Sequence, residues 1–205
     1  MGKNPVSELY DIERLIIEIE EIILNENITR HTKSHYLRNV AIQTFTEHYP
    51  NKRSKINGCR FWSEKAYNQQ FNDKYEGQKE NLFHEHVIPK KWLIEEIFLG
   101  EDEDIKKITK DYIEYYFKNF IFACVVTESE HKENLKSYAN TMPLEFLDID
   151  HDDYLKVWIR YIYSDIQVLE ISWNDKKKPI SHKNIDLNSF EIDPSVFNRT
   201  SQQKA

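Results

Sequence analysis

Two short apolar segments, "NLFHEHVI" at residues 81–88 and "FIFACVV" at 120–126, place the strongest constraint on the fold. Both have the length and the bounds of β-strands, and the second is rich in residues that favour strands. The connection between them, residues 89–118, instead shows helical spacing, as in "KKWLIEEIF". We therefore predict that residues near 82–88 and 120–126 pair antiparallel and that the connection is helical and lies outside the pair.

Helical periodicity covers much of the remaining chain. We expect helices within residues 7–24, 31–49, 63–71, 90–98, 101–120, 128–139 and 150–163. We expect Ser63 to be an N-cap, and Thr127 with Glu130 has the spacing of a capping box. The region after about residue 172 is polar and turn-rich, so we expect an ordered wrap that ends in a frayed tail.

The composition of the chain excludes several classes of protein. Hydrophobic residues make up 40% and charged residues 31%. No apolar run approaches the roughly 20 residues that span a bilayer, and the first residues lack the apolar core of a signal peptide, so we expect a cytoplasmic protein without a membrane partner. Two cysteines, Cys59 and Cys124, are too few for a disulfide framework or a four-cysteine zinc site.

The net charge of −7 argues against a surface that binds polyanions over its whole extent. Contacts with phosphate would have to be local. The candidate basic runs lie at residues 51–55, 89–91 and 175–179, and each can also be a solvated loop.

Polar side chains interrupt the first predicted strand. His84 and His86 share one face of that strand and Glu85 takes the other, because side chains alternate along a strand. Burial of an unpaired charge is costly, so this pattern is typical of a strand end that faces a cleft, or of a solvated edge strand. In "ACVVTESEHKENL" at 123–135, His131 projects from the first turn of a predicted helix.

The order strand, strand, helix with these residues resembles the HNH, or ββα-metal, nuclease family. Its first strand carries an acid followed by His, apolar residues and Pro, and "EHVIP" at 85–89 fits this pattern with Glu in place of the commoner Asp. The family helix carries His or Asn about five residues after the second strand, and His131 is five residues after Val126.

The resemblance covers residues 81–138 and departs from the family pattern in three ways. The connection between the strands is expanded, the paired cysteines of many such fingers are absent, and the middle Asn has no clear counterpart. Asn119, just before the second strand, is the best candidate for that position.

The resemblance implies a role for each of these residues. His86 would be the general base that deprotonates the attacking water, with Asn119 as the residue that orients it. Glu85 and His131 would hold one divalent cation, Mg²⁺ or else Mn²⁺ or another transition metal, against the scissile phosphate. These roles suit the reaction, because phosphodiester hydrolysis needs an activated water. It also needs a positive charge to offset the negative charge that develops on the oxygens bound to phosphorus.

The implied architecture is α+β and mostly helical, built around a ββα-metal finger, that is, an antiparallel β-hairpin plus a helix, with a helical insertion between its strands. We expect an N-terminal helical region at 1–80, the finger at 81–140 with its insertion at 89–118, and a C-terminal helix and polar wrap at 141–205 in the same globular unit.

The implied function is a metal-dependent endonuclease that acts on nucleic acid, DNA rather than RNA, in a setting such as restriction or anti-phage defence. Cleavage of both strands would need a homodimer or two sequential nicks. The alternative is a catalytically inactive HNH-like module that binds nucleic acid. A metal-dependent hydrolase with another substrate ranks third, because "HEH" lacks the helical histidine spacing of zinc peptidases.

Overall fold

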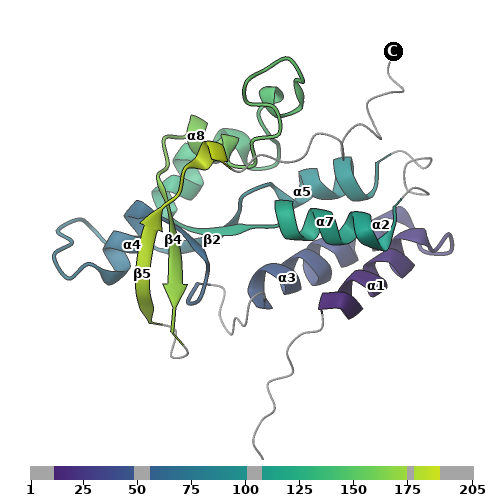
Figure 1. Cartoon of the computed structure of the whole chain (residues 1–205), viewed down its shortest axis with the longest axis horizontal. Helices are drawn as coiled ribbons and strands as arrows, with labels where there is room; N and C mark the ends of the chain where they lie inside the picture. The colour runs from purple at the N-terminus through teal and green to yellow at the C-terminus, as the bar shows by residue number, and fades with distance from the viewer. Residues whose placement is uncertain (1–11, 49–55, 101–107, 175–177, 190–205) are drawn as a thin grey trace, which may run out of the picture.

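The structure is a computed structural model, and it describes residues 12–48, 56–100, 108–174 and 178–189. The basic run at 51–55, residues 175–177 of the run at 175–179, and the first part of the helix expected at 101–120 lie outside the described residues. The chain combines a helical block with a mixed β-sheet (Figure 1), so the predicted α+β class is confirmed. Among the described residues, no helix is long and apolar enough to cross a membrane.

Among the described residues, the helical block contains four helical stretches. They are α1 (Ile12–Leu24), α2 (Arg30–Tyr36) continued by a π-helical segment (Leu37–Ala41) and α3 (Ile42–His48), α5 (Lys90–Trp92) continued by a second π-helical segment (Leu93–Phe98), and α7 (Lys110–Phe120). Figure 1 shows these helices grouped beyond one end of β2 (Leu82–His86). The described part of the connection at 89–118 is thus largely helical, and it lies outside the strand pair, as predicted.

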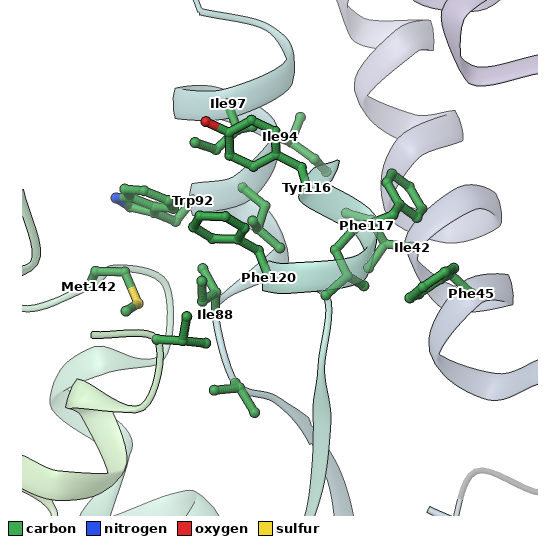
Figure 2. Packing of buried hydrophobic residues seen from close by; sticks show 14 of the residues in the cluster. Ile42, Phe45, Ile88, Trp92, Ile94, Ile97, Tyr116, Phe117, Phe120 and Met142 are labelled. Carbon is green, nitrogen blue, oxygen red and sulfur yellow. The ribbon is translucent and has the colours of Figure 1, made fainter. Parts of the chain in front are cut away.

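Aromatic and branched side chains fill the space where α3, α5 and α7 meet (Figure 2). Phe45 of α3 meets the ring of Phe117 edge-to-face at 5.1 Å between ring centroids. Trp92 contacts Phe146, whose ring centroid lies 5.3 Å away, in the same manner. Each such pair contributes about 0.5–1.5 kcal/mol beyond the burial of its area. This packing fixes the connection at 89–118, which joins the two strands predicted near 82–88 and 120–126.

In the part of the chain that the structure describes, the sheet has five strands in the order β2-β3-β1-β4-β5. The strands are β1 (Phe61–Ser63), β2 (Leu82–His86), β3 (Ala123–Thr127), β4 (Val168–Trp173) and β5 (Pro179–Asn184). β2 pairs with β3 antiparallel, with Glu85 opposite Cys124 and His86 opposite Ala123. The predicted antiparallel pair is therefore confirmed, but it is part of a larger sheet to which all three predicted regions contribute strands.

Both faces of β3 are covered, and its side chains show which face belongs to which core. Cys124 and Val126 belong to the larger core, together with the helical block. Ala123 and Val125 belong to a smaller core with Trp62 and the side chains that pack around α4 (Glu64–Phe71). Because partners in a register share a face, Glu85 lies on the larger-core face and His84 and His86 on the smaller-core face.

A helical turn follows β3, and its start is capped as predicted. The Thr127 amide donates to Glu130 Oε2 at 2.7 Å, and the Glu130 amide donates to Thr127 Oγ1 at 3.4 Å. Ser63 caps α4 by accepting from the Ala66 amide, and its hydroxyl donates to Glu130 Oε2 at 2.6 Å. The buried Glu130 carboxylate thus joins the two capped helix starts.

Glu130→Ala is expected to lower the free energy of unfolding by about 1–3 kcal/mol, because it leaves the Thr127 amide and the Ser63 hydroxyl without this buried acceptor. Urea unfolding followed by circular dichroism measures the change. Glu133→Ala, on the same turn but exposed, is the matched control and should stay within about 0.5 kcal/mol of the parent. Equal losses in the two variants would contradict the role given to Glu130.

The C-terminal region differs from the prediction. The helix expected at 150–163 is reduced to α8 (Ile159–Tyr163), and residues 168–184 contain β4 and β5 instead of only a polar wrap. Leu155 has a φ of 57°, in the left-handed region that a right-handed helix does not contain, so the helical pattern is broken before α8 begins. β5 is an exposed edge strand, whose polar sequence gives no apolar alternation to detect.

Candidate active site

Glu85 and His131 lie in direct contact. Glu85 is on β2 and His131 is on the helical turn after β3, and Glu85 Oε2 is 2.8 Å from His131 Nδ1 across 46 positions of sequence. The ring of Phe83, two residues before Glu85 on the same face of β2, stacks on the His131 ring with 4.5 Å between ring centroids. The side chain of Glu85 is 13% exposed and that of His131 is 36% exposed, so solvent reaches the pair. The structure brings together the two residues expected to hold a cation.

The contact changes the protonation of the imidazole. The hydrogen bond to Glu85, together with the negative charge of that carboxylate, raises the pKa of His131 and outweighs the opposing effect of partial burial. A metal ligand must be the neutral imidazole. Any cation that uses Nδ1 of His131 therefore competes with a proton.

Arg160 holds the other side of the Glu85 carboxylate. Its side chain, on α8, is 0% exposed, and its Nη2 lies 3.1 Å from Glu85 Oε1. Its Nη1 donates to the carbonyls of His86 at 2.9 Å and Val87 at 3.0 Å. Successive carbonyls of a strand point in opposite directions, so their convergence on one nitrogen shows that the backbone turns where β2 ends.

Arg160 was not among the residues identified from the sequence. The signal available was a single charged residue within the apolar run "VWIRYIY" at 157–163. Arginine is rarely buried without a partner, so its position in such a run indicates a buried acceptor elsewhere in the fold.

His86 lies on the opposite face of β2 from Glu85. Its ring is beside that of His84, with 5.5 Å between ring centroids, on the face of the smaller core. For His86 and Glu85 to reach one phosphate, the strand must end or twist at this point, because adjacent residues of a strand point to opposite faces. β2 does end at His86, and it is an edge strand of the described sheet, so a ligand at that edge can approach both faces. The role of His86 as a base stays a prediction.

Asn119 lies in the last turn of α7. Its side chain is exposed, and its amide donates to the Tyr115 carbonyl of the same helix at 2.8 Å. This hydrogen bond stabilises the end of α7 and does not connect Asn119 to His86. The role of Asn119 in orienting the base stays a prediction.

The Glu85–His131 pair fits a cation that is held by few protein ligands. Two ligand atoms at ~2.0–2.3 Å from one cation and at about a right angle are about 3 Å apart. The observed separation of 2.8 Å between Glu85 Oε2 and His131 Nδ1 is close to that value. Among the residues that the structure describes, no group of three or more His, Cys, Asp or Glu side chains is arranged to hold a metal ion. The remaining positions around a cation here would be left to water and substrate.

Glu80 links the chain just before β2 to the helical turn that carries His131. It precedes β2, accepts from the Ser129 amide at 2.7 Å, and pairs with Lys65 Nζ at 2.6 Å. Ser129 belongs to the turn that carries His131. Burial alone would raise the pKa of Glu80, but the hydrogen bonds from Lys65 and Ser129 lower it to about 2.

This pKa predicts a pH-dependent contribution to stability. Because the pKa of Glu80 is lowered on folding, its contribution is present above the unfolded value near 4.5 and is lost as the pH falls towards 2. Glu80→Gln should cost on the order of 1–2 kcal/mol at pH 7, and the difference should shrink below about pH 4.5. Urea unfolding at several pH values measures it. Glu76→Gln, exposed and in the same loop, is the matched control, and an equal loss of stability in the two variants at pH 7 would contradict the role given to Glu80.

Comparison of the chain with protein-family models, with curated proteins and with solved structures gave no match in any of the three.

Proposed function

We propose that the protein is a metal-dependent endonuclease of the HNH type, which hydrolyses phosphodiester bonds in nucleic acid, DNA rather than RNA. The observation that carries the proposal is the 2.8 Å contact between Glu85 and His131. An acid at the end of one strand and an imidazole on the turn after its antiparallel partner are the two metal-holding positions of the family that "EHVIP" resembles.

In this proposal Glu85 and His131 hold one divalent cation, Mg²⁺ or Mn²⁺. The cation would supply positive charge against the scissile phosphate. His86 takes a proton from the attacking water, whose oxygen forms a bond to phosphorus as the bond to the leaving oxygen breaks. Asn119 is the proposed partner that orients the base.

Local basic residues support a nucleic-acid partner despite the net charge of −7. The run at 89–91 begins three residues after the end of β2 and includes Lys91, which is exposed. A single site contacts one strand, so cleavage of a duplex would require a homodimer or two successive nicks. Restriction or anti-phage defence is a setting that suits such an activity.

The alternative function is a catalytically inactive HNH-like module that binds nucleic acid. Two observations favour it. The ring of His86 lies on the opposite face of β2 from Glu85, and the Glu85 carboxylate already forms an ion pair with Arg160. Such a module would bind DNA and leave it intact.

A plasmid-cleavage assay with the full chain separates the two functions. Supercoiled plasmid should be converted to nicked or linear product with Mg²⁺ or Mn²⁺ and should persist with EDTA. His131→Ala should strongly lower the conversion at limiting metal, whereas Glu133→Ala, on the same turn, should leave it at the wild-type level. A parallel set with single-stranded DNA and RNA tests the choice of DNA. Retarded migration of DNA without cleavage under all of these conditions would support the binding module.

A further inference from the structure

Arg160 is the most deeply buried charged side chain in contact with the candidate site. It is 0% exposed, comes from α8, and reaches Glu85 across 75 positions of sequence. We propose that Arg160 is the positioning residue of this site, which fixes the orientation of the Glu85 carboxylate and the end of β2. This inference deepens the proposed function and rests on it only for the activity measurement.

The first reason is that each oxygen of the Glu85 carboxylate has its own partner. Glu85 Oε1 is engaged by Arg160 Nη2 at 3.1 Å, and Oε2 faces His131 Nδ1 at 2.8 Å. A carboxylate with only one partner can rotate about its terminal torsion, whereas a contact on each oxygen fixes it. Arg160 therefore determines which oxygen of Glu85 is directed towards His131.

The second reason is that Arg160 also binds the backbone at the end of β2. Nη1 of Arg160 donates to the His86 and Val87 carbonyls at 2.9 and 3.0 Å. The planar guanidinium fixes the angle between its nitrogens, so one group holds the Glu85 side chain and the backbone of the next two residues in a single arrangement. The positions of Glu85 and His86 are thereby coupled.

Burial excludes the obvious alternative, in which Arg160 binds the substrate phosphate itself. A phosphate-binding arginine must present donors to the ligand, and the side chain of Arg160 has no exposed surface. Glu85 supplies the negative charge that a buried guanidinium needs. Arg160 thus acts on substrate only through Glu85 and the end of β2.

Arg160→Lys tests this proposal, because lysine keeps the buried charge but loses the planar fork. Three quantities are measured on the full chain: the thermal midpoint, the ¹⁵N shifts of the His131 ring, and the Mn²⁺ concentration for half-maximal plasmid cleavage. We expect a cooperatively folded protein in which the ¹⁵N signature of a hydrogen-bonded Nδ1 is lost and the half-maximal Mn²⁺ concentration rises about tenfold or more.

Arg60→Lys is the matched control. Arg60 also forms an ion pair with a glutamate on a strand, Glu170 of β4, with 2.7 Å between Nη2 and Oε1. It should leave the His131 ring signals and the Mn²⁺ requirement unchanged. Arg160→Lys with wild-type ring signals and Mn²⁺ requirement would overturn the proposal. It is also possible to separate the two proposals. If the wild-type protein cleaves no DNA but Arg160→Lys still loses the ¹⁵N signature of the His131 ring, the positioning role is upheld and the nuclease function is refuted.

A measurement on the unsubstituted protein decides the matter if Arg160→Lys fails to fold. Three hydrogen bonds should slow rotation of the guanidinium, so the Nη protons of Arg160 should give separate signals in ¹⁵N-resolved NMR spectra. These signals should persist when Mg²⁺ is added while the His131 ring signals shift. Averaged signals, or signals that Mg²⁺ abolishes, would show that Glu85 is not held by Arg160, and the proposal would be wrong.

Discussion

His86→Ala is expected to lower the rate of metal-dependent plasmid cleavage about 10²–10⁴-fold, the usual cost of removing a general base. The proposed task of His86 is to accept a proton from water, so the fold and the Mn²⁺ requirement should be nearly unchanged. The rate is measured at saturating Mg²⁺ with the thermal midpoint as a check of folding. His35→Ala, an exposed histidine on α2, is the control and should cleave at the wild-type rate.

The outcome bears directly on the position of His86 on the smaller-core face. A wild-type rate in His86→Ala would remove the residue from the mechanism and leave the Glu85–His131 pair to be explained in another way. A large loss would imply that substrate contacts the outer edge of β2 in the described sheet and so meets both faces of that strand.

Glu85→Gln and His131→Ala are expected to lower cleavage at limiting Mn²⁺ by on the order of 10²-fold or more, because each removes one of two proposed protein ligands. Glutamine keeps the size of the side chain and an oxygen that can accept from Arg160. Glu85→Ala is less suitable, since a buried Arg160 without its partner costs about 3–5 kcal/mol of stability.

Raising the Mn²⁺ concentration should partly restore the activity of both variants, and this rescue distinguishes ligand loss from loss of the base. Cleavage is measured over a series of Mn²⁺ concentrations for the two variants and for His86→Ala. His86→Ala should not respond. If Glu85→Gln and His131→Ala keep the wild-type dependence on Mn²⁺, neither residue holds the cation.

The local sequence determined those parts of the protein that depend on short-range chemistry. The N-cap at Ser63 and the capping box of Thr127 and Glu130 formed as predicted, because a side chain and an amide three residues apart are enough to specify them. The β2–β3 pair and the proximity of Glu85 to His131 followed from a motif that spans one strand pair and the next turn.

Only the tertiary structure decided what surrounds that pair. β4 and β5 extend the sheet through pairings with distant segments, and the polar edge strand β5 leaves no periodic signal in the sequence. The acceptors of Arg160 lie 73 to 75 positions away in the sequence. The local sequence "VWIRYIY" indicates a buried charge but does not identify Glu85 as its partner. The face on which His86 lies was likewise set by register, because a strand places neighbours on opposite sides and only the folded sheet shows what each side meets.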